Sequence, residues 1–344
     1  MPNFWSTLPK GFVGLSPMDG ITDQPCRHIQ KKYGNPDVMY TEFTCVEGIT
    51  HGATRLLKDL LFDETQRPIV AQIYGHTPED FRTVALIVCQ LGFDGVDINM
   101  GCPAKNVTHL GSGAALIKSP KLAQEIVRNV KAGVEDWYNG KSVDDTNLSD
   151  EIKAEVNSRS PIQEGQKRDT LPVSIKTRTG YEKAVTRNWI STLLETQPTA
   201  IALHGRTLNQ KYTGDANWGE IAQAAELAHQ SGVLLIGNGD VRSRAEAKPK
   251  VQQYGVDGVL IGKASWGNPW VFSDHEPTQE DRFNVAVEHA KLYETTFSHT
   301  PKYNFLPMRK HLAWYFSHFP GATQLRIKAL QTNSCEEVER LLIA

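Results

Sequence analysis

Cysteine is scarce in this sequence, and its cysteines follow no recognisable spacing. The chain of 344 residues has five of them, an odd number, and contains no CxxC motif. A disulfide framework and a cysteine-rich zinc site both depend on such pairing. The sequence therefore predicts reduced cysteines in a reducing compartment and no metal centre.

Long apolar runs and a secretory start are also lacking. The apolar runs fall far short of the roughly 20 residues that a bilayer-spanning helix needs, and the first residues, MPNFWSTLPKGF, show no basic segment followed by an apolar one. The net charge of −2 gives no global indication of nucleic-acid binding. We expect a soluble, cytoplasmic protein with no membrane partner, a monomer, in which a local basic patch would hold any RNA.

The sequence does contain a regular alternation of short β-branched segments with helix-like segments such as 78–91 and 219–230. The strand-like segments lie at 12–16, 38–42, 69–74, 95–99, 172–177, 200–204, 233–237 and 257–262. This alternation predicts parallel strands with crossover helices. Eight such units over about 270 residues fit an α/β fold of the (β/α)8 TIM-barrel type.

A doubly wound sheet is the alternative fold, but it would carry a glycine-rich phosphate turn after its first strand, where this chain has SPMDG. The ends of the predicted strands also favour a barrel, because barrel enzymes assemble their active sites there. The residues near those ends that could do chemistry are Met18, Glu42, Gln72, Asn99, Lys176, His204, Asn238 and Gly262.

Two regions depart from the alternation. Residues 139–170 are polar, with few large apolar residues, and predict a surface insertion that is helical at 148–156. Beyond residue 272 the strand-like segments stop, and the capping-box spacing that begins a helix occurs at Thr278 with Asp281 and at Ser334 with Glu337. We expect a barrel domain over 1–272 and a small, all-helical domain over 278–344.

Several motifs, taken together, resemble those of one enzyme family. They are SPMDGITDQPCR, QIYG, INMGCPAKNV, IKTRTG, LHGRT, GNGD and IGKASWGNPW, in this order along residues 16–272. With PMRKHLAWYF and FPGATQLRIKAL within 307–330, the chain resembles the tRNA-dihydrouridine synthases of the bacterial type. The resemblance implies FMN as cofactor, NADPH as reductant and specific uridines of tRNA as substrate. Only the polar insertion lies outside it.

The role of Cys102, in NMGCPAKNV, follows from chemistry as well. A hydride added to carbon 6 of uracil gives an enolate that a nearby acid must protonate at carbon 5. A thiol, with an ordinary pKa of about 8.5, is protonated at neutral pH and can be that acid. An isolated cysteine after a strand more often serves packing, so the catalytic assignment rests on the resemblance.

Four residues are expected at the substrate. The resemblance places Asn99 and Lys105 beside the base, although the asparagine could instead cap the next helix and the lysine could be merely solvated. Arg178 and Arg206 follow strand ends on the same predicted face. They could contact tRNA phosphates or the base, or they could be simple surface charges.

The flavin site is expected to come from several loops. The residues that the resemblance places at the ring are Pro17, Met18 and Asp19 through their backbone, then Gln72, Lys176 and His204. A cation such as Lys176 at the pyrimidine edge would stabilise negative charge on the reduced flavin. Without the resemblance, a salt-bridged barrel lysine would be the preferred interpretation.

Two loops predict a phosphate site on structural grounds. Asn238, Gly239 and Asp240 follow the seventh strand, and Gly262 and Lys263 follow the eighth, where barrels commonly bind phosphate through backbone amides. The family usually has arginine in place of this lysine, so a bidentate contact becomes a point-charge contact. We expect backbone binding of the FMN phosphate to persist.

The C-terminal region carries a local basic excess. Residues 301–330 contain no acidic residue and five basic ones, Lys302, Arg309, Lys310, Arg326 and Lys328, interleaved with aromatic residues. Because phosphate neutralisation supplies most of the affinity for nucleic acid, this segment is the predicted tRNA surface. The aromatic residues would form the core of the helices that display these charges.

Three other functions stay open at this point. An FMN barrel that reduces a small enone or pyrimidine, like dihydroorotate dehydrogenase or old yellow enzyme, would share the barrel and cofactor but would not need a basic helical tail. A Schiff-base aldolase that uses Lys176 would need no flavin. A tRNA-binding or chaperone role without catalysis would not need Cys102.

Overall fold

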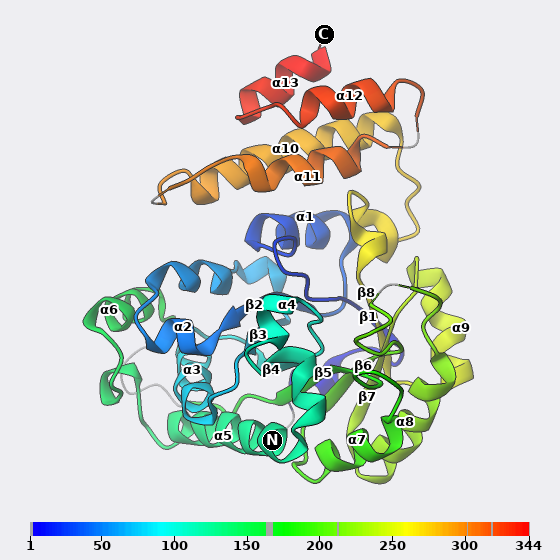
Figure 1. Ribbon diagram of the computed structural model, residues 1–344. Helices are drawn as coiled ribbons and strands as arrows, with labels where there is room; N and C mark the ends of the chain where they lie inside the picture. Colours follow the sequence, from blue (N-terminus) through cyan, green and yellow to red (C-terminus); the bar gives the residue numbers. More distant parts are fainter. Residues whose placement is uncertain (1–2, 163–167, 212, 301, 318, 344) are drawn as a thin grey trace.

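The computed structural model describes residues 3–162, 168–211, 213–300, 302–317 and 319–343. A parallel eight-stranded sheet, in the order β1-β8-β7-β6-β5-β4-β3-β2, forms its centre (Figure 1). The strands are β1 Phe12–Leu15, β2 Met39–Cys45, β3 Ile69–Tyr74, β4 Gly95–Met100, β5 Val173–Arg178, β6 Ala200–His204, β7 Leu234–Asn238 and β8 Gly258–Ile261. Each strand overlaps the segment predicted for it, so the strand predictions are confirmed.

Backbone hydrogen bonds close this sheet into a barrel. The amide of Leu15, in β1, donates to the carbonyl oxygen of Val38 over 2.9 Å, and the amide of Asp37 donates to that of Val13 over 2.9 Å. The first strand therefore adjoins the residues that lead into β2, and the two outer strands of the sheet meet. The predicted (β/α)8 TIM-barrel fold is confirmed.

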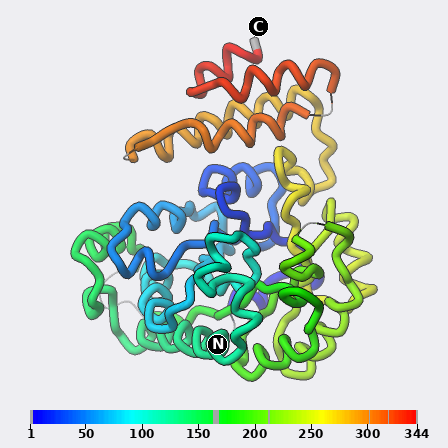
Figure 2. Tube along the Cα trace, viewed as in Figure 1, coloured from blue at the N-terminus to red at the C-terminus, as the bar shows by residue number. Residues whose placement is uncertain are grey.

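Helices connect the strands and cover the outside of the barrel (Figure 2). They are α1 Gln24–Gly34, α2 Val46–Thr50, α3 Pro78–Gln90, α4 Lys105–Thr108, α5 Pro120–Tyr138, α6 Asp150–Arg159, α7 Thr186–Leu194, α8 Trp218–Gln230 and α9 Arg244–Tyr254. Short 3-10 helices lie at Phe4–Thr7, Thr54–Leu60, Glu64–Gln66, Gly113–Lys118, Val143–Asp145, Lys263–Ser265 and Pro269–Phe272. Among the described residues, no helix has the length and hydropathy needed to cross a membrane.

The polar insertion at 139–170 contributes more to the core than its composition predicts. Its predicted helix is present as α6, which is confirmed. However, Ile152 and Val156 on that helix are fully buried in the main apolar core of the barrel. Six of the ten residues of α6 are exposed, so the prediction of a surface segment is confirmed there, and the two buried side chains anchor it to the barrel. Residues 163–167 lie outside the described part of the chain.

Four helices follow the barrel. They are α10 Gln279–Phe297, α11 Leu306–Tyr315, α12 Ala322–Ala329 and α13 Cys335–Ile343. The capping box at Thr278 and Asp281 is confirmed, since each side chain accepts a hydrogen bond from the backbone of the other. Ser334 accepts from the amide of Glu337 over 3.2 Å, but the Glu337 carboxylate accepts from Asn333, so only half of the second predicted box forms.

The helical region has an apolar core of its own. Phe305, Tyr315 and Phe316 are buried in it together with side chains of α10 and α13, which confirms that these aromatic residues pack inside the helical region. The same cluster includes Ile29 of α1 and Trp270, which belong to the barrel. The helical region therefore shares a continuous apolar contact with the barrel.

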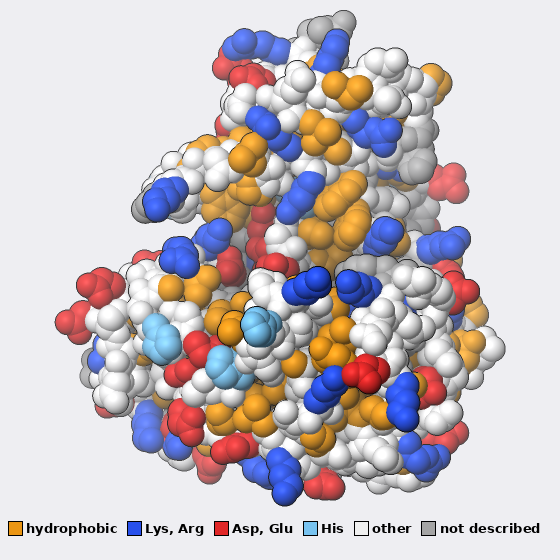
Figure 3. Space-filling view, viewed as in Figure 1, with side chains coloured by type: hydrophobic (Ala, Val, Ile, Leu, Met, Phe, Trp, Pro, Cys, Tyr) orange, Lys and Arg blue, Asp and Glu red, His pale blue; other side chains and the backbone are white. Residues whose placement is uncertain are grey.

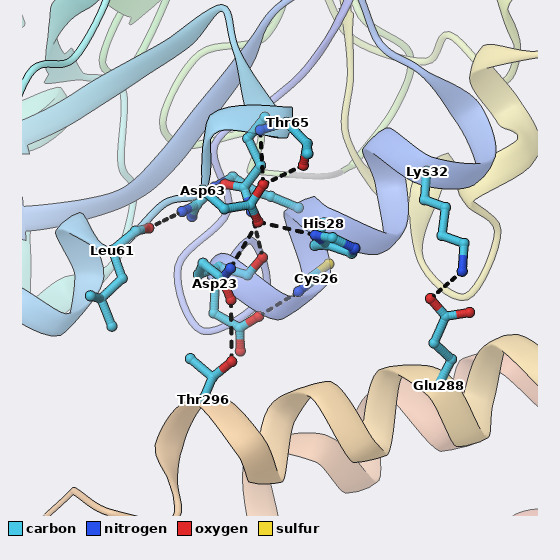
Figure 4. A network of polar contacts seen from close by, with 12 residues as sticks. Asp23, Cys26, His28, Lys32, Leu61, Asp63, Thr65, Glu288 and Thr296 are labelled. Atoms are coloured by element: carbon cyan, nitrogen blue, oxygen red, sulfur yellow. Dashed lines mark hydrogen bonds and ion pairs between the residues drawn. The ribbon is translucent and has the colours of Figure 1, made fainter.

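We call the surface where α1 and the turn before it face α10 and α11 the seam. Polar contacts cross it: Lys32 forms an ion pair with Glu288 at 2.7 Å, and Gln24 lies 3.3 Å from Thr296 (Figure 4). At its edge, the indoles of Trp266 and Trp314 are stacked, with ring centroids 4.6 Å apart and planes inclined by 18°. The seam thus combines stacking, ion pairing and apolar packing.

Candidate active site

The register of the sheet brings the predicted site residues together at the carboxyl ends of the strands. Asn99 of β4 is paired with Lys176 of β5. Two residues further along β5, Arg178 is paired with His204 of β6, and His204 is paired with Asn238 of β7. Five residues predicted separately from the sequence therefore occupy adjacent strands at one mouth of the barrel.

The turn that carries Cys102 is held by hydrogen bonds on both sides. The Asn99 Oδ1 accepts from the amides of Gly101 (3.0 Å) and Cys102 (2.9 Å), and the Cys102 carbonyl oxygen accepts from Ala114 (3.1 Å). Gly113 has φ = 60°, and a Cβ there would come within 2.9 Å of the Cys102 carbonyl oxygen. Glycine is therefore required at 113, which explains the GSGAAL segment after the cysteine.

The thiol of Cys102 is buried, with 9% of the residue exposed. Burial raises its pKa above the ordinary value of 9.0, and the nearby Asp19 acts in the same direction, whereas Arg178 and Lys176 partly oppose the rise. The thiol is therefore protonated at neutral pH, as an acid must be before it donates. Its cationic neighbours would stabilise the thiolate once the proton has left.

Asn99 and Gln72 are tied into a buried polar chain. The Gln72 Oε1 accepts from the Asn99 Nδ2 over 2.9 Å, while the Gln72 Nε2 donates to Asp97 over 2.7 Å. Asp97 also accepts from Ser174 over 2.6 Å, and burial raises its pKa to about 6. The alternative that Asn99 caps the next helix is wrong, because α4 has no side-chain cap and the Asn99 oxygen instead holds the cysteine turn.

Lys176 is held by an amide. Its Nζ donates to the Asn238 Oδ1 over 3.0 Å, and Asn238 donates in turn to the Leu260 carbonyl oxygen over 2.9 Å. Burial, with Arg178 nearby, lowers the pKa of Lys176 to about 8. Among the described residues Lys176 has no ion-pair partner, so the alternative of a salt-bridged barrel lysine is wrong.

Arg178 and Arg206 are both buried, and the alternative of simple surface charges is wrong for both. Arg178 donates to the carbonyl oxygens of Gly101 (2.7 Å) and Thr207 (3.2 Å). Arg206 forms an ion pair with Asp240 at 2.8 Å and lies 3.4 Å from the ring nitrogen of His204. The two arginines brace neighbouring loops of the mouth.

His204 is buried among these cations. Burial is the main cause that lowers its pKa well below 6.5, with Arg178, Lys176 and Arg206 acting in the same direction. The imidazole is therefore neutral at neutral pH. Next to it, Gly239 has φ = 127°, and a Cβ there would lie 2.6 Å from that of Ala216, so the loop needs glycine.

The turn after β1 and the loop after β8 lie side by side. The Trp266 indole donates to the Met18 sulfur over 3.1 Å, and a Cβ on Gly262 would lie 3.6 Å from the same sulfur. Pro17 and Met18 are half-buried, whereas Asp19 and Lys263 are exposed. The structure thus brings together the predicted ring-contacting turn and one of the two predicted phosphate loops.

Lys105 lies further out than the other predicted residues. It is exposed at the start of α4 and lines a surface hollow with His109 and Tyr181. The structure shows no contact between Lys105 and the buried groups of the mouth. Its predicted place beside the base therefore depends on how a substrate enters.

A buried charged cluster beneath the turn was not predicted from the sequence. Arg27 of α1 is fully buried and donates to Gln66 (3.0 Å) and to the Thr22 carbonyl oxygen over 2.5 Å. Burial raises the pKa of Asp23 to about 6 and that of Glu42 to about 8. The position of Glu42 near the end of a predicted strand indicated a residue at the mouth of the barrel. Nothing in the sequence indicated that Arg27 would be buried near it.

Comparison with known proteins agrees with this geometry. The family described as dihydrouridine synthase (Dus) matches residues 14–141 and 159–343, leaving out only part of the polar insertion within the matched span. A relative from Bacillus subtilis (strain 168), named "Probable tRNA-dihydrouridine synthase 2", is 33% identical over 99% of this chain and 95% of its own length. One from Staphylococcus epidermidis, named "Probable tRNA-dihydrouridine synthase", is 31% identical over the same shares.

Solved structures agree on the fold. The DHODH of Eimeria tenella, solved in complex with ferulenol, superposes with a TM-score of 0.50 at 12% identity, covering 84% of this chain and 85% of that one. The resemblance found in the motifs is confirmed by the match over nearly the whole length. This chain belongs to the dihydrouridine synthase family.

Proposed function

We propose that this chain reduces specific uridines of tRNA to 5,6-dihydrouridine, with FMN as its flavin, NADPH as reductant and Cys102 as proton donor. The observation that carries the proposal is a buried, protonated thiol in a rigid turn beside two cations at the mouth of the barrel. Membership of the family, and the names of the tRNA-modifying relatives, support the same reaction.

The mouth fits a flavin mononucleotide. Lys176 is a buried cation whose described partner is a neutral amide, which suits the electron-rich edge of a reduced flavin. Gly239 and Gly262 lie in the loops after β7 and β8, where barrels commonly bind phosphate through backbone amides. We assign the ring to Pro17, Met18, Asp19, Gln72, Lys176 and His204, and the phosphate to Asn238, Gly239, Asp240, Gly262 and Lys263. The flavin, when bound, supplies the hydride that adds to carbon 6 of uracil.

Cys102 completes the reduction by giving its proton to carbon 5. The proton leaves as the enolate collapses, and the sulfur becomes a thiolate. Lys176 and Arg178 favour that thiolate, because each lowers the pKa of Cys102. Asn99 keeps the sulfur in place through two amides of the turn. Proton transfer by a positioned group typically contributes roughly 10²- to 10⁴-fold to a rate.

The substrate contacts belong to the same proposal. We assign Asn99, Lys105, Arg178 and Arg206 to the uridine and its flanking phosphates. Arg178 and Arg206 already hold loops of the mouth, so their contribution includes shaping the site. Lys105, exposed on α4, is placed to meet an incoming RNA chain.

The helical region is the proposed tRNA-binding domain, over residues 278–344, next to a catalytic domain over 1–272. Lys and Arg side chains lie on both sides of the recess between the two (Figure 3). Arg309 is engaged with the Thr332 carbonyl oxygen (2.8 Å), and Lys310 donates to that of Gly20, so both also serve the structure. Monomeric state and cytoplasmic location stay predictions.

A single absorption experiment tests the proposal. The purified protein is scanned for flavin absorption, reduced with NADPH without oxygen, and then mixed with unmodified tRNA. Bleaching by NADPH and recovery with tRNA, but not with free uridine or orotate, is the expected result. Recovery with orotate would instead support a reductase of small pyrimidines, and a colourless protein that FMN cannot reconstitute would overturn the flavin assignment.

A further inference from the structure

Three side chains that could bind a metal ion meet inside the seam. They are Cys26 of α1, His289 of α10 and His311 of α11, and their ligand atoms all lie within 4.8 Å of one another. All three are buried, with 4%, 0% and 3% of each residue exposed. The proposed reaction uses none of them.

Two nitrogens of this group lack hydrogen-bond partners. Among the described residues, none pairs with the buried Nε2 of His289 or of His311. The Nδ1 of His289 lies 3.0 Å from the Tyr315 hydroxyl. This contact fixes the orientation of the ring and leaves the Nε2 facing the cluster. A second hydrogen bond of this kind is typical of histidines that bind metals. Unpaired buried polar atoms are costly, and a shared ligand would remove that cost.

We propose that Cys26, His289 and His311 bind a zinc-type divalent cation. A thiolate with two imidazoles is a ligand set that zinc favours, and Co²⁺ can occupy the same kind of site. The Gln30 side chain is one turn further along α1, and its buried Oε1 has no hydrogen-bond partner within the described part of the chain. It offers a fourth ligand on the same face of the helix.

Charged groups of both signs lie around the three side chains. Both imidazoles are buried, each with an unpaired Nε2 among the described residues, and an uncharged imidazole is the form that binds a metal. Burial, with Asp23 and Glu42 adding to it, raises the pKa of the Cys26 thiol, so metal binding would release its proton. Asp23 and the cations Arg27 and Lys310 also act on these side chains, so a bound ion would be held by its ligands rather than by a surplus of negative charge.

Such an ion would join the two halves of the molecule. Cys26 belongs to the barrel, three residues after Asp23, whose carboxylate accepts from the Cys26 amide over 2.8 Å (Figure 4). Both histidines belong to the helical region. The cation would therefore fix the basic helices relative to the mouth of the barrel, independently of the proposed reaction.

The test measures metal binding by the full-length, untagged protein. After treatment with a chelator, the protein is titrated with Co²⁺ and monitored for the cysteinate-to-cobalt absorption band. We expect one equivalent to bind, Zn²⁺ to displace it, and Cys26→Ala to lose the band, while Cys89→Ala, which alters a buried cysteine of α3, keeps it. Tyr315→Phe should weaken metal binding by roughly 10-fold, the lower end of the loss in affinity seen when a metal-binding histidine loses its hydrogen-bond partner.

Circular dichroism confirms that each variant is folded. If the unsubstituted protein binds neither Co²⁺ nor Zn²⁺ in stoichiometric amount, the proposal is overturned, whatever the variants do. A cobalt band that persists unchanged in folded Cys26→Ala, pointing to Cys102 or another thiol, overturns it as well. Neither result depends on flavin or tRNA activity.

Discussion

The barrel mouth and the seam both bury charged side chains, but the charges are of opposite sign. The mouth gathers Lys176, Arg178 and Arg206 around a neutral histidine. Next to the seam, Asp23, Glu42 and Asp59 lie around one buried arginine, Arg27. The two regions adjoin through the turn after β1.

The difference shows how one physical effect serves two purposes. Burial moves every titratable group toward its neutral form, so it lowers the pKa of Lys176 to about 8 and raises that of Glu42 to about 8. At the mouth, the residual positive charge is available to an anionic cofactor and to a thiolate. Around Arg27, burial favours the protonated form of the carboxyl groups, most strongly at Glu42.

The largest effect is expected at the mouth. Cys102→Ala should slow the oxidation of reduced flavin by tRNA by roughly 10²- to 10⁴-fold, the usual contribution of a positioned acid. Reduction by NADPH should be unchanged, because that step needs no thiol. Stopped-flow absorbance measures both steps, and Cys89→Ala is the matched control. A variant as fast as the parent would remove Cys102 from the mechanism.

The next largest effect is expected at the seam. Arg27→Met leaves buried acids without their cation and should cost about 3–5 kcal/mol of unfolding free energy near neutral pH. The loss should shrink at low pH, where Asp23 and Glu42 hold protons. Urea unfolding measures it, with Arg82→Met, which removes an exposed ion pair, as control. Equal losses in the two variants would contradict the role of burial.

A smaller effect concerns the slope of stability with pH. Glu42 holds a proton in the folded chain up to about pH 8, whereas the unfolded chain releases it near 4.5. Stability should therefore fall as pH rises from 6 to 8, by at most about 1.4 kcal/mol per unit of pH. Glu42→Gln should flatten the curve in denaturant titrations. An unchanged slope would show that another group titrates.

The smallest effect should have the opposite sign. In protein without flavin, folded Lys176 loses its proton near pH 8, whereas the unfolded chain keeps it up to 10.5. Stability should therefore rise with pH in this window, and Lys176→Met should remove the rise. Thermal melts at pH 8 to 10 measure it, with the exposed Lys105→Met as control. If stability still rises with pH in Lys176→Met, a group other than Lys176 causes the rise, and the opposite pH dependence of mouth and seam is not explained by these two residues.

Most of the barrel could be predicted because its signals are local. Several strands carry a polar residue near the carboxyl end of a short apolar segment, as with Asn99 in β4 and Lys176 in β5. Parallel strands then place those ends at one mouth without further information. The membership of Cys102 in this group was therefore predictable, although its assigned role still awaits a test.

What could not be predicted depends on contacts between distant segments. The spacing of Cys26, His289 and His311 gives no indication that three helices bring them together, and the search for closely spaced cysteines predicted no metal centre. Likewise, nothing in the sequence indicated the hydrogen bonds of Gln72 with Asp97 and Asn99, and the flavin contact of Gln72 stays a prediction. Periodicity identifies elements, but it does not say which of them touch.

The stacked indoles at the edge of the seam are a built-in spectroscopic probe of the contact between the barrel and the helical region. Trp266 belongs to the barrel and Trp314 to α11, and they are two of only seven tryptophans in the chain. The fluorescence and near-ultraviolet circular dichroism of neighbouring indoles depend on their separation and relative angle. Both signals should change if the helices lifted from the barrel, so docking can be followed in an unlabelled protein.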